Sequence, residues 1–137
     1  MYASSAAVYG LGKVPMKEDQ ELKPLNIYGS SKLEMDRIAE SYCDRIKTIV
    51  GLRYFNVFGP REHYKGKMAS MIYKLALQIK AGKRPRVFSY GEQSRDHIYV
   101  KDVIDANVKA MSYEGFDIFN VGTGIETNFN DLIYNIN

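Results

Sequence analysis

An alternation of strand-like and helical segments is the feature of this sequence that most constrains its fold. Residues 48–55 are mostly β-branched and aromatic and lie before Gly59-Pro60, which is typical of a buried strand. Residues 28–46 carry apolar side chains at helical spacing, namely Met35, Ile38, Ala39, Tyr42, Cys43 and Ile46. A second helical pattern covers about residues 68–81 and ends at Gly82. Strands that alternate with helices predict an α/β fold with a largely parallel sheet.

Shorter patterns predict the remaining elements. Residues 2–8 are typical of a strand end that runs into a turn, and residues 12–23 of a loop. Further along, we expect strands at residues 86–89, 97–100 and 118–121, a helix from Asp102 to about Met111, and a last helix from near Asn128.

The composition narrows the class of protein. The chain has 137 residues, a net charge of +3 and 45% hydrophobic residues, which fits a globular domain and excludes disorder. No apolar run approaches the roughly 18 to 20 residues of a membrane span, and no secretion signal opens the chain, so we expect a cytoplasmic protein without a membrane partner. The basic residues are scattered, which argues against nucleic acid as a partner. Cys43 is the only cysteine, and His63 and His97 lack partners at ligand spacing, so no metal site is expected.

One group of polar residues has the pattern of a proton-transfer site. Ser5 follows the first strand, and Tyr28 and Lys32 lie four residues apart at the start of a helix, so both leave the same helix face. An ammonium group beside a phenol favours the phenolate, which can accept a proton from an alcohol while a hydride leaves the carbon. The bare Tyr-x-x-x-Lys spacing also fits a chance pair facing solvent, and the serine in the right order favours the catalytic interpretation.

Several motifs in order resemble the extended short-chain dehydrogenase/reductase superfamily of nucleotide-sugar epimerases and dehydratases. The resemblance covers nearly the whole chain and rests on residues 4–10, 24–32, 53–61, 95–103 and 119–124. It implies the C-terminal part of a Rossmann-type doubly wound parallel sheet, with part of a smaller substrate-binding domain. Residues 1–60 and 97–115 are then expected in the nucleotide-binding domain, and residues 61–96 and 116–137 in the substrate-binding domain.

A narrower resemblance concerns the stretch Lys65-Gly66-Lys67-Met68-Ala69-Ser70, which is similar to that of ADP-glycero-manno-heptose 6-epimerases. It implies interconversion of the two ADP-heptose epimers at C6 by transient oxidation, a step toward lipopolysaccharide core precursors. Without the resemblance, Lys65 has the pattern of a solvated loop lysine.

The resemblance also implies roles for individual residues. Ser5, Tyr28 and Lys32 match the catalytic serine, tyrosine and lysine, and Lys65 matches a second acid/base. Tyr28, Lys32 and Val57 are expected at the cofactor. Lys67 and Lys74 stand where family members can have serine and histidine, and a lysine there can pair with phosphate. The residues expected at the nucleotide-sugar substrate are Asn56, Lys67, Lys74, Phe88 and Arg95.

The cofactor that the resemblance implies is NADP, with NAD not excluded, because the residues that select between them do not occur here. The glycine-rich dinucleotide fingerprint is also absent from the sequence. We therefore expect a segment of a longer enzyme, inactive by itself and a homo-oligomer when full length. The alternatives are a UDP- or dTDP-sugar 4-epimerase or dehydratase and, in another class, a non-catalytic dinucleotide-binding sensor or scaffold.

Overall fold

The computed structural model describes residues 1–137, apart from the side chain of Ser89. The chain forms two compact units. Unit 1 comprises Met1–Phe55 and Asp102–Val121, and unit 2 comprises Asn56–Lys101 and Gly122–Asn137.

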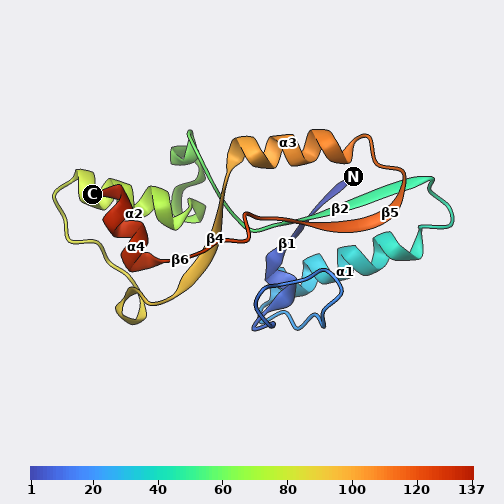
Figure 1. Cartoon of the computed structure of the whole chain (residues 1–137), viewed down its shortest axis with the longest axis horizontal. Coiled ribbons are helices and arrows are strands. Elements are labelled where there is room, and N and C mark those ends of the chain that lie inside the picture. The colour runs from blue at the N-terminus through green and yellow to red at the C-terminus, as the bar shows by residue number, and fades with distance from the viewer. The chain divides into compact units, whose positions relative to one another are not determined.

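Unit 1 is a parallel sheet with a helix on each face (Figure 1). The strand order is β1 (Tyr2–Ser5), β2 (Thr48–Tyr54), β5 (Gly115–Val121), and both pairs are parallel. Helices α1 (Ile27–Ser41) and α3 (Val100–Ala110) cover opposite faces. The central strand β2 is buried along its interior, as its run of β-branched residues predicts. The predicted α/β fold with a parallel sheet is confirmed.

The core of unit 1 lies where β1 runs into a short 3₁₀ helix, η1 (Ala6–Tyr9). Val8 and Tyr9 of η1 are completely buried and pack with Leu33 of α1. Burying large apolar side chains in this way is the main source of stability for such a unit, at ~1.5 to 3 kcal/mol each. This packing fixes the end of β1 against α1.

Unit 2 is a small mixed sheet with two helices. Strand β3 (Asn56–Phe58) is parallel to β4 (Ser94–Tyr99), and β6 (Glu126–Asn128) is antiparallel to β4. Helices α2 (Met71–Lys80) and α4 (Phe129–Ile136) share a core of Leu75, Phe129 and Leu132. The 3₁₀ segments η2 (Glu62–Met68) and η3 (Ser89–Gly91) complete the unit.

The boundaries of the two units differ from those expected. Residues 116–121 belong to unit 1, because β5 pairs with β2 along its whole length. Residues 56–60 and 97–101 belong to unit 2, because β3 pairs with β4.

Two predicted elements also need correction. The strand expected at residues 86–89 is wrong, since this stretch is irregular and Val87 packs into the helical core of unit 2. Helix α1 ends at Ser41 instead of residue 46, and Gly29, Leu33 and Asp36 form its buried face. Its predicted apolar stripe is largely exposed, including Met35 and Ile38.

Neither a membrane helix nor a cluster of metal ligands occurs among the described residues. None of the helices there combines the length and apolar character needed to cross a membrane. Within the same residues, no three His, Cys, Asp or Glu side chains gather in a way that could hold a metal ion.

Candidate active site

Ser5 is the last residue of β1, at the carboxyl end of a parallel strand. Its backbone is still extended, and its side-chain oxygen accepts a hydrogen bond from the Ala7 N–H at 3.2 Å, capping η1 where the strand ends. The hydroxyl proton is left free to donate. Ligands of open α/β sheets bind outside the carboxyl ends of the strands, so this serine lies where a substrate is expected.

The amino end of α1 lies directly against the turn that Ser5 caps. A Cβ atom on Gly29 would come within 2.7 Å of the Ala7 carbonyl oxygen, so only glycine allows the helix to approach this closely. Asn26 caps the helix by accepting the Gly29 N–H at 2.8 Å. Tyr28 is therefore held beside the Ser5 turn, with 55% of its surface exposed.

Lys32 lies one turn further along α1 and reaches back to β1. Its ammonium group donates to the Ala3 carbonyl oxygen at 2.9 Å and lies 5.9 Å from the centre of the Tyr28 ring. The structure thus places Tyr28 and Lys32 on the part of α1 that lies against β1 and η1, and Ser5 is the residue where these two elements join. All three belong to unit 1.

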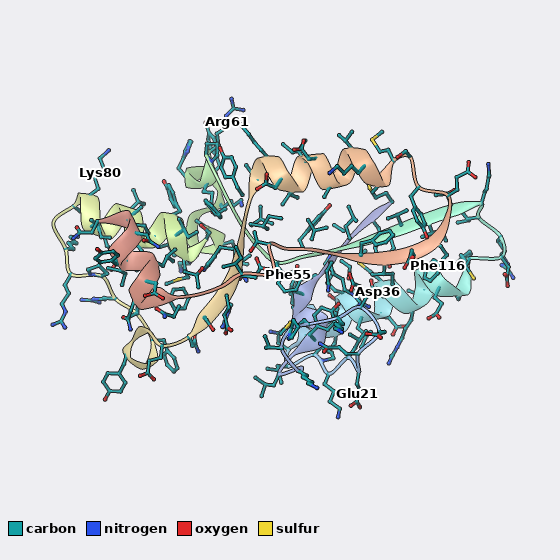
Figure 2. All side chains as sticks on the ribbon, in the orientation of Figure 1. Glu21, Asp36, Phe55, Arg61, Lys80 and Phe116 are labelled. Atoms are coloured by element: carbon teal, nitrogen blue, oxygen red, sulfur yellow. The ribbon has the colours of Figure 1, made fainter. Side chains whose placement is uncertain are left out.

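A buried ion pair fixes α1 against the sheet. Asp36, on the side of α1 that faces the strands (Figure 2), accepts hydrogen bonds from Arg53 Nε at 3.1 Å and from the Tyr2 hydroxyl at 2.9 Å. The Arg53 Nη2 atom lies 3.0 Å from the same carboxylate, and both side chains are 4% exposed. These contacts tie the helix that carries Tyr28 and Lys32 to β1 and β2.

The tyrosines of this network are weaker acids than a free tyrosine. Burial and the neighbouring Asp36 carboxylate raise the pKa of Tyr2 far above its ordinary value. Burial also raises the pKa of Tyr9, whose hydroxyl accepts from Arg53 Nη1 at 2.9 Å and donates to Asn120 at 2.7 Å. Both phenols are engaged inside the protein, whereas Tyr28 lies at the surface.

Lys65 lies in unit 2, on the 3₁₀ segment η2. Its ammonium nitrogen is 3.7 Å from a carboxylate oxygen of Glu62, and its side chain is 51% exposed while that of Glu62 is 3% exposed. Gly66, the next residue, has φ 52 and ψ −122, a conformation that favours glycine. The lysine therefore lies beside a buried carboxylate, whereas a free surface lysine has no such neighbour.

The residues expected at the substrate are also in unit 2, as is Val57 in β3. Asn56 donates from Nδ2 to the Asp96 carbonyl oxygen at 3.0 Å, which places it beside β4, the strand that carries exposed Arg95. Lys74 donates to the Lys67 carbonyl oxygen at 2.7 Å, so these two lysines lie together. Phe88 is exposed on the segment before β4.

Asp96 closes the turn that follows β5. Its carboxylate accepts hydrogen bonds from the N–H groups of Thr123 and Gly124, each at 2.8–2.9 Å. The amides of Thr123 and Gly124 are therefore engaged by this carboxylate, as in a structural turn.

Sequence reasoning did not identify Asp36, Arg53 or Glu62. Arg53 is a charged residue inside an otherwise apolar strand, and such a charge requires a buried partner. This pattern was the signal that could have identified it. For Glu62, the lysine three residues later was a weak signal.

The chain is similar to several nucleotide-sugar epimerases. The chain is 42% identical to the ADP-L-glycero-D-manno-heptose-6-epimerase of Thiobacillus denitrificans over 140 aligned residues, which cover 96% of this chain and 42% of that protein. The crystal structure of the Helicobacter pylori ADP-L-glycero-D-manno-heptose-6-epimerase matches with a TM-score of 0.93 and 47% identity, over 98% of this chain and 43% of that one.

A UDP-N-acetylglucosamine 4-epimerase from Methanobrevibacter ruminantium matches with a TM-score of 0.87 and 36% identity, over 97% of this chain and 44% of that one. The chain thus spans less than half the length of these relatives. Residues 1–122 match the NAD dependent epimerase/dehydratase family, and the chain is a member of that family.

Proposed function

We propose that this chain carries the proton-transfer residues of an enzyme that interconverts ADP-D-glycero-manno-heptose and ADP-L-glycero-manno-heptose at C6. The observation that carries the proposal is the identity of 42% and 47% to two ADP-heptose 6-epimerases over nearly the whole chain. The gathering of Ser5, Tyr28 and Lys32 at a strand end supports it.

The residues of unit 1 fit a nicotinamide cofactor, for which we propose NADP. Lys32 has three N–H donors and uses them on one carbonyl and one thioether, so it keeps donor capacity for ribose hydroxyls. Tyr28 presents its hydroxyl at the surface beside it. Tyr28 and Lys32 would hold the nicotinamide end. When bound, the cofactor supplies the hydride acceptor and donor of the reaction.

Proton transfer at the C6 hydroxyl is assigned to two side chains. Tyr28 takes the hydroxyl proton of one epimer as hydride leaves C6, and Ser5 donates a hydrogen bond to the same oxygen. The product of this step is a flat ketone. Lys65 then protonates the oxygen as hydride returns to the opposite face, and the roles reverse for the other epimer. Two acid/bases are needed because each serves one stereoisomer.

Unit 2 is assigned to the nucleotide sugar and unit 1 to the cofactor. Asn56 would contact the sugar, and Phe88 and Arg95 the nucleotide diphosphate. Lys67 and Lys74, which lie together, add positive charge for phosphate.

The biological setting follows from the same resemblance. We propose a cytoplasmic step in the synthesis of lipopolysaccharide core precursors, carried out by a homo-oligomer of a longer protein that contains this chain. By itself the chain should neither bind NADP tightly nor turn over. Titration calorimetry of the chain with NADP tests this, and a micromolar affinity would contradict it.

The central test replaces Tyr28 by phenylalanine in the longer protein. Loss of a positioned acid/base should lower epimerisation by a factor of ~10² to 10⁴, far more than it weakens cofactor binding, because Lys32 still contacts the ribose. The matched control is Tyr42→Phe, because Tyr42 is an exposed tyrosine at the other end of α1. If Tyr28→Phe keeps most of the activity, the residues around Ser5 are not the active site.

Substrate choice separates the heptose reaction from its rivals. A UDP-sugar 4-epimerase, the activity of the Methanobrevibacter relative, would turn over a UDP-hexosamine and leave ADP-heptose unchanged. A sensor or scaffold would bind the cofactor and turn over neither. Chromatography of both substrates after incubation with the longer protein distinguishes the three outcomes.

A further inference from the structure

Glu62 is a buried carboxylate beside the proposed second acid/base. Its side chain is 3% exposed, and it accepts hydrogen bonds from the Gly59 N–H at 3.1 Å, the Ser70 N–H at 2.6 Å and the Ser70 hydroxyl at 2.8 Å. A buried carboxylate with this many donors is well compensated for the loss of water.

These hydrogen bonds join the two ends of one loop. Gly59 follows β3, and Ser70 caps α2 by accepting the Tyr73 N–H at 3.2 Å. Glu62 therefore clasps residues 59–70, the loop that carries Lys65, and fixes where this loop leaves the sheet and where it enters the helix.

The contact with Lys65 is of a different kind from the clasp. At 3.7 Å, the distance between Lys65 Nζ and the Glu62 carboxylate exceeds that of a charge-assisted hydrogen bond, and the lysine is half exposed. Lys65 thus keeps its N–H groups free toward solvent while the fixed negative charge holds it close to one place. A compact, flexible ammonium without such a partner would sample many positions.

The carboxylate stays charged at neutral pH. Burial acts to raise the pKa of Glu62, but the hydrogen bonds from Ser70 and Gly59 and the Lys65 charge outweigh it, so the pKa lies below its ordinary value.

We propose that Glu62 is a positioning residue that holds Lys65 where it exchanges a proton with one epimer of the substrate. The inference rests on the proposed function, because it takes Lys65 as the second acid/base. Glu62 itself does not touch the substrate. Misplacement of a reacting group by about 1 Å can cost a factor of ~10² in rate, so loss of the Glu62 charge should slow the step that uses Lys65.

A role confined to folding makes a different prediction. General loosening of unit 2 would slow the oxidation of both epimers to a similar extent. A positioning role slows only the step that uses Lys65 and spares the step that uses Tyr28.

The experiment measures the two steps separately in the longer protein. Enzyme loaded with oxidised NADP is mixed rapidly with each purified ADP-heptose epimer, and formation of reduced cofactor is followed by its near-ultraviolet absorbance. Lys65→Met identifies the epimer whose oxidation uses the lysine. Glu62→Gln, nearly the same size but uncharged, should slow oxidation of that same epimer roughly tenfold to a hundredfold and change the other less than about threefold. Ser70→Ala is the matched control, because it removes one hydrogen bond of the clasp and the side-chain cap of α2 but keeps the Glu62 charge beside Lys65. It should slow both steps alike or neither.

The outcomes separate the inference from the proposed function. If Lys65→Met epimerises at the wild-type rate, the proposed function fails. If Lys65→Met is inactive in one step but Glu62→Gln slows both steps equally or neither, the positioning role alone is overturned. Should Glu62→Gln not fold, Glu62→Asp keeps the charge with a shorter reach. It should still slow only the Lys65 step, and an equal loss in both steps would overturn the role.

Discussion

Removal of the Asp36 carboxylate should strongly destabilise unit 1. In Asp36→Ala, Arg53 loses the acceptor for Nε and Nη2 and keeps only the Tyr9 hydroxyl and the Glu18 carbonyl oxygen, both bonded to Nη1. Tyr2 loses its acceptor as well. Both partners of the pair are 4% exposed, so bulk water reaches the remaining charge poorly.

The expected cost is large compared with the stability of such a chain. Breaking a buried ion pair by removing one partner typically costs about 3 to 5 kcal/mol, because a charge is left buried and unpaired. Domains of this kind have a total unfolding free energy of about 5 to 15 kcal/mol. Asp36→Ala should therefore remove roughly a fifth or more of the stability.

Two measurements on this chain test the reasoning. Urea unfolding followed by circular dichroism gives the change in the unfolding free energy, and hydrogen exchange of the β2 amides reports on unit 1 alone. The control is Glu114→Ala, which breaks the exposed pair with Lys47 and should cost less than about 1 kcal/mol.

A double variant gives the sharpest refutation. Asp36→Leu with Arg53→Met replaces both charges by apolar side chains and should recover most of the loss, since no buried charge remains. If Asp36→Ala costs less than about 1 kcal/mol, or if the double variant is as unstable as the single one, the pair does not hold α1 to the sheet.

Two further predictions concern residues of each unit. Burial lowers the pKa of His97, with Asp96 opposing and Arg95 adding to the effect, so the fold favours the neutral ring and the unfolded chain binds the proton more readily. The unfolding free energy should be fully retained above about pH 6.5 and fall by at most ~1.4 kcal/mol per pH unit below it. In His97→Phe this part of the pH dependence should vanish. An unchanged slope of the unfolding free energy against pH would contradict the assignment to His97. In unit 1, Gly29→Ala should lower the unfolding free energy measured in urea by about 1 to 3 kcal/mol, because its Cβ would meet the Ala7 carbonyl oxygen. Gly82→Ala is the control: a Cβ there meets nothing within 4 Å, so only the smaller cost of the positive φ is expected. Equal losses in the two variants would contradict the close approach of α1 to η1.

The parts of the structure that were predictable from sequence are those set by local pattern. The run of residues 48–55 predicted β2, because a short, continuous run of β-branched and aromatic residues is typical of a strand that is buried on both faces. The strand expected at residues 86–89 failed because a short apolar run does not reveal its partner, and Val87 packs against helices instead.

The candidate site divides in the same way. Tyr28 and Lys32 share a helix face by spacing alone, and Ser5 follows from the strand end. Asp36 and Glu62 could not be assigned, because their partners include backbone N–H groups and residues on other elements, which only the fold brings together.

The two buried carboxylates differ in what their cations are free to do, and this difference explains why only one of them is assigned to the reaction. Asp36 meets Arg53 at 3.0 Å with both side chains buried, so moving the cation would expose an unpaired charge to the core. Glu62 is equally buried, but its hydrogen bonds come from backbone and serine donors, and its cation Lys65 lies at 3.7 Å and half exposed. Lys65 can therefore shift or give up a proton without leaving a buried carboxylate bare. The first pair is suited to fixing a helix, and the second to holding a group that must act on a substrate.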